Sequence, residues 1–252
     1  MITKNYHELP PLRSDLEKHL ADTRAYIAQM CERGAAEEMS EFFTRREDGY
    51  DEHMMQFAPC YDVTASHIPA DCRDLLDLGC GTGLELDALD RICKQENRAF
   101  PRVVGVDMTE ALVAQLYKKH PDKDITVKMG SYFEVPLGTE AFDCAVSVES
   151  IHHFSLDEKL PLFRRVYDAL KAGGVFLQCD YFAACEEEVE MCEEHWRIRR
   201  AMNHDIGEDG FVHVDRPKMA YDEAAVLKEA GFSEVLYCTV GVEGTLLLIA
   251  KK

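Results

Sequence analysis

The chain has 252 residues, of which 46% are hydrophobic, so one α/β domain with an appendage can bury a sizeable core. Its formal net charge of -19 repels phosphate backbones, which argues against nucleic acid as a partner. Residues 1–20 are polar, and no apolar run reaches the roughly 18 residues of a membrane span, so we expect neither a signal peptide nor a membrane protein.

The ten cysteines show no metal-binding spacing, because no C-x-x-C pair occurs. Several fall inside expected strands, helices or turns, among them Cys80, Cys144 and Cys179. We interpret them mostly as buried free thiols. A reducing compartment follows from that interpretation, and we expect the protein to be cytoplasmic.

The first 69 residues have a helical pattern. Apolar residues recur at helical spacing over residues 14–33, where Ser14 and Glu17 fit a capping box. A second helix is expected around Met39 and Phe43. We expect residues 1–69 to cover the mouth of a main domain formed by residues 70–252. The alternative is that they only pad the outside of its sheet.

Residues 75–86 predict a buried strand, a glycine turn and a helix, in that order. Gly79, Gly81 and Gly83 permit positive φ and close approach of a ligand to the backbone. The turn and the helix N-terminus would present N–H groups to a polar or anionic group. A dinucleotide fingerprint would need a third glycine at Leu84, and a phosphate-binding P-loop would need a lysine that is absent here.

With Asp77 on the strand, the turn reads D-x-G-x-G-x-G. This resembles the first motif of class I S-adenosylmethionine (SAM)-dependent methyltransferases, of the type that act on small molecules. The resemblance implies an α/β fold: a doubly wound, seven-stranded, Rossmann-like sheet of order 3-2-1-4-5-7-6 with a helical N-terminal cover. It also implies SAM as cofactor. The alternative is a tight strand-to-helix turn that binds no ligand.

The next two strands would add cofactor contacts. Asp107 ends a strand about 20–25 residues after the glycines, where a ribose-binding acid is expected, and Met108 could lie against the adenine. The alternative for Asp107 is a charge at a helix N-terminus. A third strand ends at Gly130, followed by Ser131 where the family often has an acid, and Tyr132 offers a stacking face.

The fourth expected strand, 142–148, runs into His152 and His153, which resembles the fourth motif region of the small-molecule enzymes. The Asn/Asp-Pro-Pro-Tyr/Phe motif of amino-N6 DNA methyltransferases is absent. His153 is our candidate base, or it only positions the acceptor. Two adjacent histidines could suggest a metal, but on a loop or at a helix start they point apart and no carboxylate spacing supports a site, so we predict no metal.

Tyr50 belongs to a Tyr-Asp pair that many small-molecule methyltransferases carry at this distance before the first motif, where the tyrosine tends to lie near the methionine end of SAM. Plain helix packing is the alternative. The expected cofactor-binding residues are Tyr50, Asp77, Gly79, Cys80, Gly81, Gly83, Asp107, Met108, Gly130, Ser131, Tyr132 and Val148.

Residues 181–220 interrupt the α/β alternation with acids first and bases last, the charge order that a single solvated helix prefers. The functional interpretation is a lid over the acceptor pocket that carries His195, Trp196 and His204. Together with His153, His195 and Trp196 are our candidate substrate contacts.

These patterns predict methyl transfer from SAM to a small-molecule acceptor that is not a polyanion, with no nucleic acid or membrane partner. We expect a monomer or homodimer. Two alternatives stay open: a non-catalytic SAM-binding sensor or subunit, and another SAM-using transferase such as one with carboxymethyl chemistry.

Overall fold

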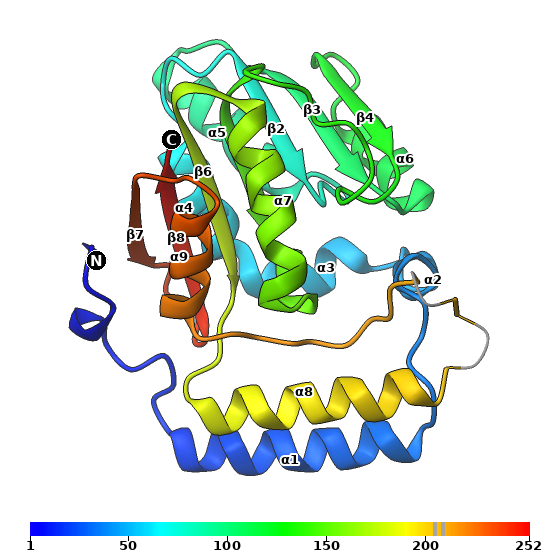
Figure 1. The fold of residues 1–252 in the computed structure, drawn as a ribbon. Coiled ribbons are helices and arrows are strands. Elements are labelled where there is room, and N and C mark those ends of the chain that lie inside the picture. The colour runs from blue at the N-terminus through cyan, green and yellow to red at the C-terminus, as the bar shows by residue number, and fades with distance from the viewer. Residues whose placement is uncertain (204–205, 208–209) are drawn as a thin grey trace.

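The computed structural model describes residues 1–203, 206–207 and 210–252. Its centre is an eight-stranded sheet of order β1-β7-β8-β6-β5-β2-β3-β4 (Figure 1). The strands are β1 (Ile2–Thr3), β2 (Asp74–Leu78), β3 (Arg102–Asp107), β4 (Ile125–Met129), β5 (Phe142–Val148), β6 (Leu170–Tyr181), β7 (Glu234–Thr239) and β8 (Thr245–Lys251).

The sheet confirms the expected topology. Strands β4, β3, β2, β5 and β6 pair in parallel, and β8 and β7 continue the sheet antiparallel. Counted without β1, this is the order 3-2-1-4-5-7-6. The expectation of seven strands is corrected by one, because Ile2 and Thr3 add a short antiparallel edge strand to β7.

Helices cover both faces of the sheet, and each face has its own apolar cluster. Leu86 and Leu89 of α5 and Leu116 of α6 pack on one face, and Leu162 and Phe163 of α7 pack on the other. The helices are α1 (Leu16–Glu32), α2 (Met39–Thr44), α3 (Tyr50–Met54), α4 (Ala58–His67), α5 (Leu84–Glu96), α6 (Glu110–Lys119), α7 (Leu156–Ala169), α8 (Glu186–Ala201) and α9 (Ala220–Glu229).

Two local boundaries differ from the expectation. The first helix begins at Leu16, and Asp15 caps it by accepting a hydrogen bond from the Lys18 N–H at 3.0 Å, so Ser14 and Glu17 do not form the expected capping box. Strand β6 begins at Leu170 and includes the Gly173-Gly174 pair that we expected to lie between helix and strand. Gly173 takes a φ of +77°, which lets the strand bend there.

The cover is built from two distant parts of the chain. Helices α1 and α8 lie side by side along the lower edge of Figure 1, beyond the ends of the strands. A bridge between Glu38 and Val212 joins the segments that follow these two helices. His204, which we assigned to the lid, lies outside the described residues.

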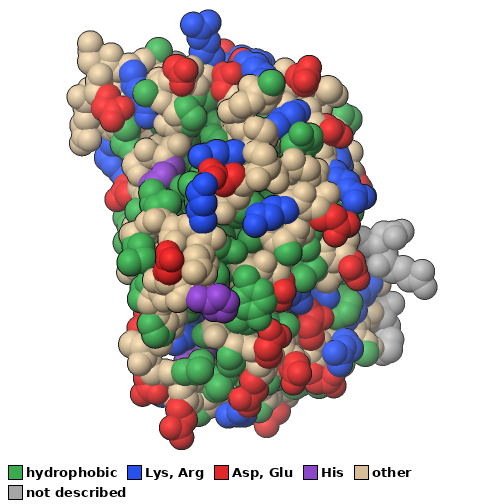
Figure 2. All heavy atoms as spheres, turned by 60° about the vertical axis from the view of Figure 1, so that its left-hand side comes forward, with side chains coloured by type: hydrophobic (Ala, Val, Ile, Leu, Met, Phe, Trp, Pro, Cys, Tyr) green, Lys and Arg blue, Asp and Glu red, His purple; other side chains and the backbone are tan. Residues whose placement is uncertain are grey.

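The described part of the chain contains no helix that is both long and apolar enough to cross a bilayer. All ten cysteines are free. Figure 2 shows acidic and basic side chains interspersed on one face, with acids gathered toward the lower part of that view.

Candidate functional site

The carboxyl ends of the parallel strands meet at one edge of the sheet, where ligands bind in open α/β folds. There the chain encloses a cavity, which we call the inner chamber. Its walls include Gly79 and Gly81 after β2, Asp107 at the end of β3, Gly130 after β4 and Glu149 after β5. The expected residues Tyr50, Met108, Ser131, Tyr132, Val148 and His153 also line it.

The glycine turn and Asp107 hold each other in place. The Asp107 carboxylate accepts the Gly81 N–H at Oδ2 and the Thr109 N–H at Oδ1, both at 2.8 Å. Burial raises the pKa of Asp107, and these backbone donors oppose that rise. Gly81 has a φ of +45°, and a Cβ there would stand 3.8 Å from the Tyr50 hydroxyl. Any longer side chain at Gly81 would therefore extend into the space next to the Tyr50 hydroxyl.

Asp77, Cys80 and Gly83 of the expected cofactor set are not among the residues lining the inner chamber. Asp77 is buried beside Glu85. Burial and the Glu85 carboxylate raise the pKa of Asp77 well above its usual range. Cys80 packs against Gly105, where a Cβ would come within 2.7 Å of the Cys80 sulfur. Gly83 is the N-cap of helix α5 and has a φ of +76°. Their direct contact with a cofactor stays a prediction.

Helix α3 contributes Tyr50 to the wall of the inner chamber. It places the Tyr50 hydroxyl near Gly81, and burial raises the pKa of Tyr50, as does the nearby Asp107 carboxylate. Asp51 accepts a hydrogen bond from the Thr82 hydroxyl of the glycine turn. The Lys119 ammonium bridges Asp51 at 3.0 Å and Asp87 at 2.7 Å. Asp51, the second residue of α3, thus links the cover to the glycine turn.

A wider cavity, the outer chamber, adjoins the inner one and has a volume of about 730 Å³. Phe43, Tyr50, Glu149 and His153 line both chambers. The walls of the outer chamber combine aromatic rings with charged side chains, among them Phe42, Arg46, Phe57, His152, Tyr181, His213 and Asp215.

Sequence reasoning missed Glu149 as a site residue. It follows β5 directly, with a φ of +49° that is uncommon for a residue other than glycine. Its carboxyl group accepts the Thr245 hydroxyl at 3.3 Å. Burial and the Asp180 carboxylate raise the pKa of Glu149 to about 8. The signal available in the sequence was the position of Glu149 directly after an expected strand, close to that of Asp107 at the end of β3.

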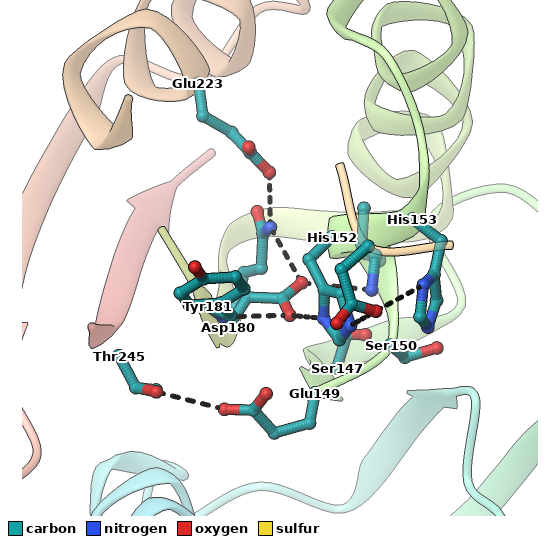
Figure 3. Close-up of polar contacts among 12 residues, drawn as sticks. Ser147, Glu149, Ser150, His152, His153, Asp180, Tyr181, Glu223 and Thr245 are labelled. Atoms are coloured by element: carbon teal, nitrogen blue, oxygen red, sulfur yellow. Dashed lines mark hydrogen bonds and ion pairs between the residues drawn. The ribbon is translucent and has the colours of Figure 1, made fainter. Parts of the chain in front are cut away.

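The two histidines converge on one acid, contrary to our expectation that they point apart. His152 Nε2 and His153 Nδ1 lie 3.4 and 3.3 Å from Asp215 Oδ1, and the two ring centroids are 4.0 Å apart. His152 Nδ1 also contacts Asp180 Oδ1 at 2.5 Å (Figure 3). Asp180 receives the Ile151 N–H at 3.0 Å, which fixes the acid behind the histidine.

The pKa values of His152 and His153 shift in opposite directions. Burial opposes a charge on His152, but the Asp180 and Asp215 carboxylates outweigh it and raise the pKa of His152 well above its usual range. Burial and the neighbouring His152 lower the pKa of His153, so His153 is neutral near pH 7. A neutral imidazole beside the shared wall of the chambers can accept a proton.

The other expected substrate contacts lie elsewhere. Trp196 packs on Val212 and Val214, with the Arg216 guanidinium 4.0 Å from the centre of its ring. His195 lines two further cavities, both of which share Asp215 with the outer chamber. Neither residue is among those lining the two chambers.

The fold and the glycine turn with its buried acid define a Rossmann-like domain of the kind that binds SAM. Comparison with known proteins agrees with this class. The family profile described as "Methyltransferase domain" matches residues 76–178. Residues 76–178 are therefore similar to a methyltransferase domain, which agrees with the resemblance of the glycine turn to class I SAM-dependent enzymes.

Individual proteins share parts of the chain. A cypemycin N-terminal methyltransferase from a Streptomyces species is 34% identical over 46% of this chain and 45% of its own length. A carboxy-S-adenosyl-L-methionine synthase from Wolinella succinogenes is 24% identical over 77% of this chain and 86% of its own length. The match thus spans less than half of the first relative. The solved structure of human N-acetylserotonin methyltransferase in complex with SAM superposes with a TM-score of 0.62 at 17% identity, covering 93% of this chain and 66% of that one.

Proposed function

We propose that this chain transfers the methyl group of SAM to a small-molecule acceptor. The observation that carries the proposal is the pair of adjoining chambers, which share a wall of Phe43, Tyr50, Glu149 and His153. SAM would occupy the inner chamber, with its ribose at Asp107 and its methionine end toward Tyr50. The acceptor would occupy the outer chamber and reach the sulfonium methyl past the shared wall.

The residues present fit SAM on two counts. The Asp107 carboxylate uses one lone pair on each oxygen for backbone N–H groups and keeps further acceptor capacity for ribose hydroxyls. Gly81 supplies a surface without a side chain beneath Tyr50, where a ligand can approach the backbone.

Methyl transfer asks little covalent chemistry of the protein. The acceptor's lone pair forms the bond to the methyl carbon while the S–CH₃ pair returns to sulfur, giving S-adenosylhomocysteine. Alignment of the three atoms in a site closed to water supplies most of the rate. His153 serves as base where the acceptor must lose a proton, because its imidazole is neutral and lies at the shared wall.

The acceptor's surroundings come mainly from the cover. Residues 1–69 contribute Phe42, Arg46 and Phe57 to the outer chamber. Strand β6 contributes its last residue, Tyr181, and His213 and Asp215 reach the chamber from beyond α8. These two regions would choose the acceptor, whereas residues 70–180 together with Tyr50 would hold SAM.

We also propose a cytoplasmic protein, monomeric or homodimeric, that acts on neither nucleic acid nor membranes. Ten free cysteines support a reducing compartment. The net charge of -19 disfavours encounter with polyanions.

The test is calorimetric titration of SAM into the intact chain and into Asp107→Ala. Charge-assisted hydrogen bonds contribute about 1.5–3 kcal/mol each, so we expect the variant to bind SAM at least tens-fold more weakly. Asp122→Ala, which changes an exposed acid, is the matched control and should leave the affinity unchanged. Equal affinities in all three proteins would end the SAM assignment.

Product analysis then separates the rival functions. Incubation with SAM and fractions of cell extract should yield S-adenosylhomocysteine and a product heavier by one methyl group. A non-catalytic SAM-binding protein would release none with any fraction. Carboxymethyl chemistry, suggested by the Wolinella relative, would instead give a carboxylated SAM derivative detectable by mass spectrometry.

A further inference from the structure

Three potential metal ligands meet at the wall of the outer chamber. One potential ligand atom from each of His152, His153 and Asp215 lies within 4.8 Å of the other two, and His152 Nε2 and His153 Nδ1 both face Asp215 Oδ1. His152 and His153 come from the turn after β5, and Asp215 comes from the segment before α9. We propose that these residues form a binding site for a divalent transition-metal ion, with Zn²⁺ as the ion that the ligand set suits best.

The separations between the three groups support a shared ion. The contacts of Asp215 Oδ1 with the two histidines measure 3.4 and 3.3 Å, longer than the roughly 2.9 Å of an ordinary N–H···O hydrogen bond. Two ligands held about 2.0–2.1 Å from a tetrahedral zinc ion lie about 3.3–3.4 Å apart. The two separations between a histidine nitrogen and Asp215 Oδ1 therefore match the spacing that a common ion would impose.

A buried acid behind His152 completes the pattern. Asp180, which is 1% exposed, contacts His152 Nδ1 and leaves Nε2 directed toward Asp215. Gln178 in turn donates to Asp180 at 3.5 Å and also contacts Glu223 (Figure 3). A metal-bound histidine almost always has such a partner on its other nitrogen, because the partner fixes the tautomer and the ring orientation.

Three protein ligands leave a fourth position, as in catalytic rather than structural zinc sites. All three line the outer chamber, and the Asp215 side chain is 45% exposed, so a small molecule there has access to the ion. The role given to the ion rests on the methyl transfer proposed above. An acceptor hydroxyl bound to the ion would lose its proton to water more readily, because a bound cation lowers the pKa of the group.

The chemistry then balances without a further reactant. The O–H proton passes to solvent, the oxygen lone pair forms the O–CH₃ bond, and the S–CH₃ electron pair returns to sulfur as S-adenosylhomocysteine leaves. The acceptor class that follows is a small molecule with an acidic hydroxyl group. His153 would then act as a metal ligand in place of the base role given above, and the ion would give the acceptor oxygen its alkoxide-like character.

Calorimetric titration of Zn²⁺ into the chelator-treated full-length chain tests the site without SAM or acceptor. We expect one ion per chain with a micromolar or lower Kd. His152→Ala and Asp215→Asn should each weaken binding at least tenfold, and Asp180→Asn should weaken it by about 10–100-fold through loss of the orienting contact. No binding by the intact chain, or equal binding by the three variants, would overturn the proposal.

His120→Gln is the matched control. His120 forms a similar buried pair with Asp87, at 3.0 Å, but no second histidine belongs to that cluster among the described residues. Zn²⁺ affinity should be unchanged in this variant. Substitution with Co²⁺ should give the visible absorption of a four-coordinate ion with nitrogen and oxygen ligands. A thiolate-to-Co²⁺ charge-transfer band would instead place the metal at the cysteines and refute the assignment.

SAM titrations of the same variants keep this proposal separate from the proposed function. Asp107 and the glycine turn lie in the inner chamber, so His152→Ala and Asp215→Asn should bind SAM with unchanged affinity. Loss of Zn²⁺ binding with intact SAM binding supports the metal site. Intact SAM binding in a chain that takes up no Zn²⁺ refutes the metal site alone.

Discussion

Removal of the Asp51 carboxylate should loosen the cover above the glycine turn and weaken SAM binding. Asp51 is the acceptor for the Thr82 hydroxyl and one of two carboxylates held by Lys119. Thr82 is 1% exposed, so Asp51→Ala leaves a buried donor without this partner. Such a loss costs about 1–3 kcal/mol. The ion pair with Lys119 adds less, because both side chains are partly exposed.

The magnitude follows from the fraction of molecules with α3 in place. A loss of about 2 kcal/mol in docking α3 corresponds to a roughly 30-fold smaller equilibrium constant for the closed cover. Because only the closed form offers Tyr50 to the ligand, the apparent Kd rises by the same factor at most. We expect an increase of between about threefold and 30-fold.

Calorimetric titration of SAM into the intact chain and Asp51→Ala measures the change directly. Asp62→Ala is the matched control, because Asp62 pairs with Arg91 on the surface and both side chains are more than half exposed. Thr82→Val should reproduce part of the effect, and the double variant should be less than additive. If the Kd of Asp51→Ala for SAM lies within twofold of the Kd of the intact chain, the role given to the Asp51–Thr82 contact is refuted.

Two further predictions concern stability. Lys159 and Glu223 form a 2.6 Å ion pair with each side chain 1% exposed, so Lys159→Met should lower the free energy of unfolding by about 3–5 kcal/mol in urea titrations. Adding Glu223→Gln should restore much of that loss, and an equally unstable double variant would contradict the reasoning. For Asp87, burial raises the pKa, but the partners His120 and Lys119 outweigh it and lower the pKa below its usual range. Its contribution is therefore present above about pH 3.9 and lost as the pH falls through the folded-state pKa. The stability difference between the intact chain and Asp87→Asn should shrink from pH 5 to pH 3, and a difference that is constant with pH would refute this assignment.

The sheet was predictable because its signals are local. Each parallel strand has its own apolar pattern and runs into a glycine or an acid, so the strands and the place of Asp107 followed from the residues, whereas the order of the strands came from the resemblance to a known family. The two-residue strand β1 carries no pattern of its own, and only its pairing with β7 defines it. The bend at Gly173 likewise depends on β5 beside it.

The acceptor side was less predictable because its contacts join distant residues. His152 and His153 stood out in the sequence, but the acid between them is Asp215, more than 60 residues later in a segment without periodicity. Trp196 was an attractive substrate contact as the only tryptophan, yet it packs on Val212 and carries Arg216. Composition indicates which residues are unusual, whereas tertiary packing decides what they face.

The pairing of α1 with α8 has a consequence for synthesis of the chain on the ribosome. Helix α1 ends at Glu32 and its partner begins at Glu186, so more than 150 residues are made between them. At about 5–20 residues per second, the first helix waits roughly 8–30 s for the surface it packs on. During that interval the apolar side chains of α1, Leu20 among them, lack their native partner. The closed cover is therefore among the last parts of the molecule to form, after the sheet that holds the cofactor.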